Sequence, residues 1–256
     1  MTATDVTAAL PFPEGVSYGF FAEAWNDHAA TARRLIERSG ARTVCEIGGG
    51  ANPTLPLEFV RERRLDYTIL DISPAELEKA PDGYRKVAAD ICGEPLPLAG
   101  PFDFMFSKML AEHVGSGRAF HRNVFDLLAP GGLAFHFFPT LYAPAFVANR
   151  LLPEDVSSIA LQAFAPRDRD RHGKFPARYS WCRGPTRAQR ARLEALGYEI
   201  VGYRGFFGHD YYRRVPPLQW ASRRTAAWLC RHPWAPLTTF ALVVLRKPGR
   251  AAERSR

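Results

Sequence analysis

Cysteine is scarce and scattered in this chain. Four cysteines occur in 256 residues, with no Cys-x-x-Cys spacing between any two of them. Structural zinc sites and the disulfide frameworks of small secreted proteins need closer spacing, so the pattern argues against both. The N-terminus also lacks a basic segment followed by an apolar core, and no apolar run approaches the length of a membrane span. We therefore expect a folded cytoplasmic protein with no membrane partner.

Acidic residues are scarce in the second half of the chain. Residues 131–256 hold 21 Lys and Arg against 8 Asp and Glu, a net charge of +13, whereas residues 1–130 hold 13 against 18, a net charge of −5. Such an asymmetry indicates an anionic substrate or partner near the C-terminal half, or a solvated basic surface with no partner.

Glycine is concentrated in one stretch. The apolar run 42–47 ends in three glycines at 48–50, followed by Asn52 and Pro53. This pattern predicts a buried strand, a tight loop and a helix that begins near Pro53. Glycines let a backbone approach a ligand closely, and a helix N-terminus favours an anion. The loop is therefore a candidate ligand site.

Alternating apolar patterns predict an α/β protein. We expect strands at 42–47, 66–71, 86–89, 101–107, 133–138, 198–203 and 238–246, and helices at 18–39, 55–64, 118–129, 187–196 and 217–231.

One acid stands at the end of the second predicted strand. Asp71 follows Glu46 by 25 positions, about one strand-helix-strand unit. A carboxylate there can accept hydrogen bonds from both hydroxyls of a ribose.

Several motifs resemble those of the class I S-adenosylmethionine-dependent methyltransferases, in particular their type 11-like branch. Glu46, Gly48, Gly50 and Asn52 resemble motif I, with Asn52 where the family often has a third glycine. The segment after the family's fourth strand is resembled by residues 108–114, Lys-Met-Leu-Ala-Glu-His-Val. Before the fifth strand the chain has Leu-Leu-Ala-Pro-Gly-Gly-Leu-Ala, a sequence characteristic of the family.

The resemblance implies a fold and a division of the chain. The fold is a Rossmann-like, doubly wound sheet of seven strands with the last strand antiparallel and with helical insertions on the substrate side. The chain is expected to be one domain, 1–256, divided into an N-terminal arm and lid helix (1–40), a cofactor-binding core (41–138) and two substrate-side insertions (139–184 and 205–236).

The resemblance also implies S-adenosyl-L-methionine as the cofactor. In the family the acid after the second strand holds the ribose and the acid after the third takes the adenine amino group, which gives Asp71 and Asp90 these roles. The expected cofactor-binding residues are Glu46, Gly48, Gly49, Gly50, Asn52, Asp71, Ile72, Asp90, Ile91 and Ser107. Met109 stands where metal-binding relatives have a glutamate, so no metal is implied.

The catalytic and substrate candidates follow from the same analogy. Glu112 and His113 would face the methyl-transfer site, and His113 is the first candidate for a general base, although it could instead only order its loop. His209 is a reserve catalytic candidate. The aromatic residues Tyr142, Tyr179, Trp181 and Tyr212 are candidates for substrate binding, with core packing as the alternative.

The expected activity is methyl transfer to an oxygen, nitrogen or carbon atom of a small or medium-sized metabolite. This acceptor could be anionic or carrier-bound and belong to specialised metabolism. We expect the enzyme to be a monomer or a homodimer. The chain lacks the Asn/Asp-Pro-Pro-Tyr/Phe and Pro-Cys motifs of nucleic-acid methyltransferases. Two alternatives stay open: an RNA methyltransferase that uses the basic C-terminal half, and a non-catalytic module that binds S-adenosylmethionine.

Overall fold

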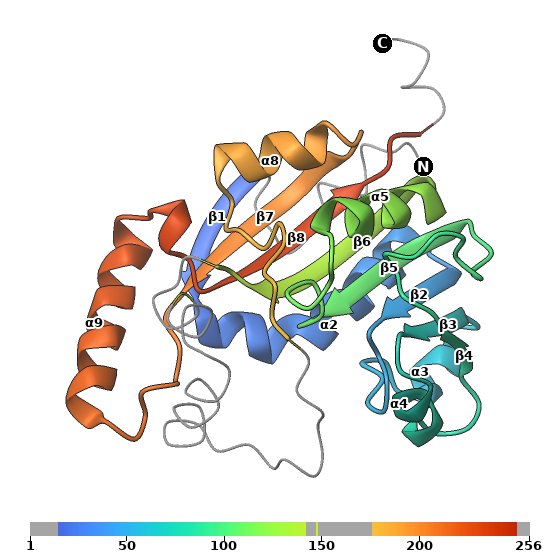
Figure 1. Ribbon diagram of the computed structural model, residues 1–256, viewed down its shortest axis with the longest axis horizontal. Coiled ribbons are helices and arrows are strands. Elements are labelled where there is room, and N and C mark those ends of the chain that lie inside the picture. Colours follow the sequence, from blue (N-terminus) through green and yellow to red (C-terminus); the bar gives the residue numbers. More distant parts are fainter. Residues whose placement is uncertain (1–14, 142–146, 148–175, 250–256) are drawn as a thin grey trace.

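A sheet of eight strands forms the centre of the protein (Figure 1). The computed structural model describes residues 15–141, 147 and 176–249. The strands are β1 (Gly15–Phe20), β2 (Thr43–Ile47), β3 (Asp66–Asp71), β4 (Arg85–Ala88), β5 (Phe102–Lys108), β6 (Leu128–Pro139), β7 (Glu199–Phe207) and β8 (Phe240–Arg246). The helices are α2 (Phe21–Ser39), α3 (Leu57–Glu62), α4 (Pro74–Lys79), α5 (Gly117–Leu127), α8 (Arg187–Glu194) and α9 (Pro216–Arg231), with a short 3₁₀ turn, η1 (Ala235–Leu237).

The strand order is β1-β7-β8-β6-β5-β2-β3-β4. Strand β8 runs antiparallel to both of its neighbours, β6 and β7, whereas every other pair is parallel. This arrangement confirms the predicted doubly wound α/β fold with an antiparallel last strand. The carboxyl ends of β2, β3, β4 and β5 therefore meet at one edge, which is where open α/β sheets bind ligands.

The eighth strand, β1, corrects the prediction of seven. Residues 18–20 were expected to begin the first helix, but Gly15–Phe20 pairs in parallel with Gly202–Phe207, and α2 begins at Phe21. Val16, Tyr18 and Phe20 alternate with smaller residues, a pattern of period two that suits a strand. Strand β7 continues to Phe207, beyond the predicted end of this strand at residue 203.

The helices cover both faces of the sheet. Helix α2 lies against one face and contacts β1, β6, β7 and β8, while α5 and α8 lie on the opposite face (Figure 1). The buried residues of α2 recur at intervals of three and four, which turns one stripe toward the sheet. The helix ends at Ser39, and the left-handed backbone of Gly40 (φ = 68°) turns the chain so that the Ala41 N–H donates to the carbonyl of Ile36 at 3.2 Å. In the described part of the chain, none of the helices combines the length and apolar character needed to cross a bilayer.

The helix after the glycine loop begins later than predicted. It starts at Leu57, with Pro56 as its N-terminal cap, and it is only six residues long. Residues 51–55 form a turn followed by bends instead. The glycine loop therefore ends in an irregular segment and not in a helix N-terminus, so the predicted helix-dipole contribution to the site is wrong.

Candidate cofactor site

A pocket of about 550 Å³ opens at the carboxyl edge of β2, β3, β4 and β5. Its volume lies within the range of small-molecule sites, about 300–1,000 Å³. The lining combines the glycine loop, the ends of the three strands that follow it in the chain and one arginine from a distant segment: Ile47, Gly48, Gly49, Gly50, Ala51, Asn52, Leu70, Asp71, Ile72, Glu76, Ala89, Asp90, Ile91, Met109, Leu110, His113, Val114, Gly115 and Arg178.

Two glycines of the loop, Gly48 and Gly49, leave little room for a side chain. A Cβ atom on Gly48 would lie 2.2 Å from Cδ1 of Leu110, and one on Gly49 would lie 2.8 Å from Cγ2 of Ile69. Gly48 also has a positive φ of 79°, which side chains disfavour, and its N–H donates to the Leu70 carbonyl at 2.7 Å. The loop backbone is thus held close to the strand ends and forms one wall of the pocket.

Glu46 lies beneath the loop and is absent from the pocket lining, although it was predicted to bind the cofactor. Both of its carboxylate oxygens accept the Thr54 N–H at 3.0 Å, and the hydroxyls of Thr54 and Tyr67 donate to it as well. Burial raises the pKa of this carboxyl above its usual value, while the hydrogen bonds act in the opposite direction. Glu46 therefore fixes the two ends of the loop relative to β3.

Two acids reach the pocket from the ends of β3 and β4. Asp71 is partly buried, and its Oδ1 accepts the Ser73 N–H at 2.9 Å. Burial raises the pKa of the Asp71 carboxyl. The Asp90 Oδ1 accepts the Cys92 N–H at 2.8 Å. This bond closes a tight turn with Ile91 at its centre. Ile72 is exposed at the rim of the pocket, so an apolar surface lies beside the Asp71 carboxylate.

Ser107 is not placed at the pocket, contrary to the sequence-based expectation. Its side chain is fully buried, and its Oγ lies 2.8 Å from Nδ1 of His136. The two residues are register partners on β5 and β6. Because side chains of directly paired residues point to the same face of a sheet, the register directs Ser107 toward His136.

The segment after β5 brings His113 to the pocket and is joined there to residues 176–179. The backbone carbonyl of Glu112 accepts the N–H groups of Arg178 and Tyr179, at 2.6 and 2.9 Å, and Nδ1 of His113 lies 3.2 Å from the Pro176 carbonyl oxygen. His113 Nε2 is 3.7 Å from Glu112 Oε1. His113 lines the pocket, whereas Glu112 is buried and does not line it.

Sequence reasoning missed Arg178 and Met109 as pocket residues. Arg178 lies within the basic C-terminal half, whose charge indicated an anionic substrate or partner, but nothing in the sequence singles out this arginine. Met109 adopts a left-handed backbone (φ = 53°), which is costly for a residue with a side chain and accompanies the sharp turn out of β5.

The predicted substrate residues are not gathered at this pocket. Tyr142 lies outside the described residues. Tyr179 is buried, and Trp181 packs between His121 and Arg192, at 6.0 and 5.7 Å, so both belong to the core side of the segment. Neither lines the pocket.

The reserve candidates His209 and Tyr212 lie elsewhere as well. Nδ1 of His209 accepts the Tyr211 N–H at 3.2 Å, and the His209 and Tyr212 rings are 4.6 Å apart. Burial lowers the pKa of His209. Neither residue lines the glycine-loop pocket, so the structure does not bring them together with His113.

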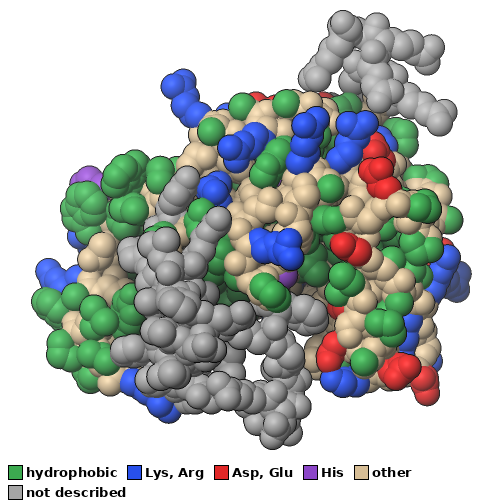
Figure 2. Space-filling model, viewed as in Figure 1, with side chains coloured by type: hydrophobic (Ala, Val, Ile, Leu, Met, Phe, Trp, Pro, Cys, Tyr) green, Lys and Arg blue, Asp and Glu red, His purple; other side chains and the backbone are tan. Residues whose placement is uncertain are grey.

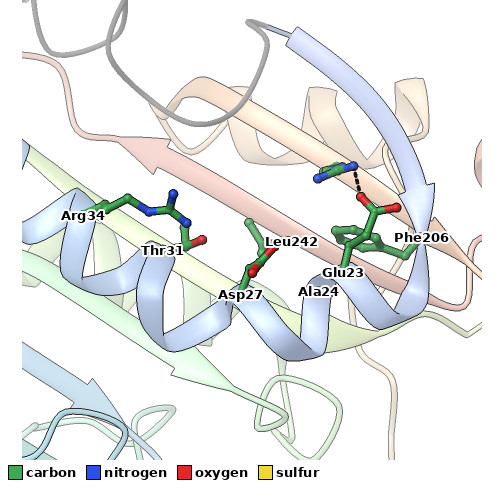
Figure 3. Close-up of a pocket in the computed structure, with 8 residues that line it drawn as sticks. Glu23, Ala24, Asp27, Thr31, Arg34, Phe206 and Leu242 are labelled. Atoms are coloured by element: carbon green, nitrogen blue, oxygen red, sulfur yellow. Dashed lines mark hydrogen bonds and ion pairs between the residues drawn. The ribbon is translucent and has the colours of Figure 1, made fainter.

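A second, smaller pocket of about 250 Å³ lies along α2 (Figure 3). Glu23 and Asp27 of α2 face it together with Arg204 of β7, and Glu23 forms an ion pair with Arg204. Glu23 also accepts the N–H of Phe20 at 2.9 Å, so it closes the first turn of the helix. The contacts of this pocket join α2 to the sheet.

Comparisons with known proteins agree with this geometry. The model of a family described as a methyltransferase domain matches residues 23–201. No curated protein matches the chain in sequence. Among solved structures, a S-adenosylmethionine-dependent methyltransferase from Clostridium acetobutylicum has a TM-score of 0.53 at 10% identity, covering 88% of this chain and 92% of its own. A proposed sarcosine dimethylglycine methyltransferase from Galdieria sulphuraria has a TM-score of 0.51 at 14% identity, covering 89% of this chain and 88% of its own.

The fold and the family match define a class I S-adenosylmethionine-dependent methyltransferase. The chain belongs to the methyltransferase-domain family whose model spans its residues 23–201. Its cofactor is S-adenosylmethionine.

Proposed function

We propose that the chain transfers a methyl group from S-adenosylmethionine, bound in the glycine-loop pocket, to an oxygen, nitrogen or carbon atom of a small or medium-sized anionic metabolite, free or carrier-bound, in specialised metabolism. One observation carries the proposal: the pocket combines the glycine loop, acids at the ends of β3 and β4, and the imidazole and guanidinium of His113 and Arg178.

The residues present fit the cofactor. Gly48, Gly49 and Gly50 line the pocket and carry no side chain, so their backbone can lie against a ligand. Asp71 is the acceptor for the ribose hydroxyls, Asp90 for the adenine amino group, and Ile72 and Ile91 supply apolar surface for the base. When bound, the cofactor supplies an electrophilic methyl group on a sulfonium.

Two residues of the chain act at the acceptor end in this proposal. Arg178 provides a positive charge for a carboxylate or phosphate of the acceptor, and it is attached through its backbone to Glu112. His113 takes a proton from the acceptor when the attacking atom carries one, and its Nε2 lies 3.7 Å from Oε1 of Glu112. In a direct displacement of the methyl group by the acceptor atom, positioning of the acceptor supplies most of the rate enhancement.

The two alternatives differ in what they require of the chain. An RNA methyltransferase would use the basic C-terminal half for phosphate contacts, and its RNA affinity would fall steeply with salt. A non-catalytic module would bind the cofactor without turnover. The position of His113 in the pocket favours the enzyme, because a module that only binds needs no titratable side chain there.

Calorimetry with S-adenosylhomocysteine tests the cofactor assignment. We expect binding by the wild type and a loss of at least about tenfold in affinity for Asp71→Ala, since hydrogen bonds to a charged group contribute about 1.5–3 kcal/mol. Asp82→Ala removes an exposed acid outside the pocket and should bind as the wild type does. Equal affinity of Asp71→Ala and Asp82→Ala would refute the assignment of the ribose site.

A panel of anionic and neutral acceptors tests the reaction. His113→Ala should keep the affinity for S-adenosylhomocysteine within about threefold and lower turnover by about a hundredfold or more if a proton must be removed. Arg178→Ala should raise KM for anionic acceptors more than for neutral ones. Turnover of RNA alone, or no turnover of any acceptor, would favour the corresponding alternative.

A further inference from the structure

The outward side of α9 carries exposed tryptophans and arginines. Its inner side is buried through Gln219, Ala226 and Leu229, which pack toward β1 and β7. Trp220 and Trp228 are 64% and 57% exposed, although indole rings are usually buried. Four of the six exposed large hydrophobic side chains in the described residues fall within 218–234.

Helical geometry places the exposed side chains in one stripe. Trp220, Arg224, Trp228 and Arg231 follow one another at intervals of four, four and three, and all point away from the buried side of the helix. The guanidinium of Arg224 lies over the Trp220 ring at 5.1 Å. The helix lies at one edge of the molecule, at the left of Figure 1, and Figure 2 shows hydrophobic and basic side chains together over this edge.

The charge around the stripe has one sign. Residues 211–246 contain no Asp or Glu, while Arg213, Arg214, Arg223, Arg224 and Arg231 lie on α9 or just before it. Asp210, just before the helix, pairs with Arg223 at 3.0 Å. A partner that covers this face therefore has to be negatively charged and must accept indole rings.

We propose that α9 docks onto an anionic membrane surface, with Trp220 and Trp228 in the headgroup region and Arg224 and Arg231 beside lipid phosphates. Tryptophan is enriched at membrane interfaces because its ring is apolar and its N–H is polar. Basic side chains near an anionic surface add electrostatic attraction. In this mode of binding a helix lies along the membrane surface and does not cross it, so a spanning segment is not required.

Other occupants fit the face less well. A two-fold dimer that packs α9 against α9 of a second copy would bring arginines against arginines, because no acid on α9 can pair with them. Single-stranded RNA is held in basic grooves with open aromatic faces. On α9 one face of each ring is already occupied, by Arg224 at Trp220 and by His232 at Trp228.

Sedimentation of the full chain with vesicles tests the proposal. We expect binding to vesicles of equal phosphatidylcholine and phosphatidylglycerol, little binding to phosphatidylcholine alone, and a blue shift of tryptophan fluorescence on binding. Trp220→Ala/Trp228→Ala should weaken binding by at least about tenfold and reduce the blue shift, because interfacial binding scales with the apolar area inserted. Arg224→Ala/Arg231→Ala should weaken it by about tenfold or more, through the loss of two basic side chains near the surface.

Helix α8 supplies a matched control. It is also basic and exposed but carries no tryptophan, so Arg187→Ala/Arg192→Ala removes the same charge from another face and should bind as the wild type does. Circular dichroism should show that every variant is folded, since all four α9 side chains are exposed.

Four results would overturn the proposal. The first is a wild type that stays in the supernatant. The second is an α8 variant that loses as much binding as the α9 variants. The third is a dimer that Trp220→Ala/Trp228→Ala converts to a monomer, which would assign the face to a second copy. The fourth is binding of single-stranded RNA that depends on the two tryptophans and displaces the vesicles.

Discussion

Gly50 and Asp71 lie so close that a side chain at position 50 would meet the proposed ribose-binding carboxylate. A Cβ atom on Gly50 would lie 3.0 Å from Oδ2 of Asp71, a separation tighter than ordinary van der Waals contact. Gly50 also has a positive φ of 40°, which residues with side chains rarely adopt. Glycine at position 50 thus permits the left-handed turn of the loop and leaves room for the Asp71 carboxylate.

Gly50→Ala should therefore abolish detectable binding of S-adenosylhomocysteine, because the added methyl group displaces Asp71 or the loop. The left-handed backbone should also cost about 1–2 kcal/mol of stability. Calorimetry and thermal unfolding measure the two effects separately.

Gly131→Ala is the matched control for this substitution. Gly131 also has a positive φ, of 84°, but no atom lies within 4 Å of the position of its Cβ. The control should lose similar stability and keep its affinity. If both variants bind normally, the contact between position 50 and Asp71 is unimportant for the site.

Acidification should weaken cofactor binding through Asp71. Burial raises the pKa of this carboxyl above its ordinary value, so it begins to protonate at a higher pH than an exposed aspartate. A protonated carboxyl accepts hydrogen bonds from ribose hydroxyls less well than the anion does. The affinity for S-adenosylhomocysteine should therefore fall as the pH is lowered toward the raised pKa. Asp71→Asn, measured from pH 8 to pH 4.5, should bind weakly at all pH values and show a flatter profile.

The parts of the fold that were predictable from the sequence are those set by local patterns. The apolar runs at 42–47 and 66–71, the acid at Asp71 and the glycines at 48–50 gave the strand-loop-strand core, and the pocket forms there. Each of these signals lies within about thirty residues, so no long-range pairing had to be inferred.

The errors arose where distant segments decide the outcome. Residues 18–20 fit a helical pattern by themselves, and only pairing with β7, nearly two hundred residues later, makes them a strand. Ser107 stands at the expected strand end, but its register against His136 turns it away from the pocket. Arg178 reaches the pocket through backbone bonds to Glu112, a contact that no sequence spacing encodes.

Removal of the carboxylate beneath the loop should damage both stability and binding. Glu46→Ala leaves a cavity and removes the acceptor for the Thr54 and Tyr67 donors, so we expect a loss of about 3 kcal/mol or more in the free energy of unfolding. Affinity for S-adenosylhomocysteine should fall as well, although Glu46 does not line the pocket. Chemical denaturation and calorimetry measure the two losses.

Tyr67→Phe tests the hydrogen bonds of Glu46 with a smaller change. It removes one of the donors to Glu46 and leaves both contacts with Thr54, so it should cost about 1 kcal/mol of stability. Cofactor affinity should stay within about threefold of the wild type. If Tyr67→Phe loses as much affinity as Glu46→Ala, the connection to β3, and not the bonds to Thr54, positions the loop.

Buried histidines should make the protein sensitive to acid. Burial lowers the pKa of His28 and His121 to about 3 and that of His136 well below its ordinary value, and the charge of Lys108 adds to the effect at His28. Between pH 3 and 6.5 the unfolded chain therefore binds protons that the folded chain does not. Stability should be full above pH 6.5 and should fall below it, by about 1.4 kcal/mol per pH unit for each such histidine.

His28→Phe isolates one of these contributions. The His28 ring stacks on Phe135 at 5.0 Å and lies near Phe106 and Phe137, so phenylalanine keeps the aromatic packing and removes the titrating group. At pH 7.5 the variant should be as stable as the wild type or slightly more so, and its drop in Tm between pH 7.5 and pH 5.0 should be smaller. Replacement of the exposed His232 by Phe should leave that drop unchanged. An identical drop for wild type and His28→Phe would show that His28 takes up its proton in the folded protein, and burial would then not govern its titration.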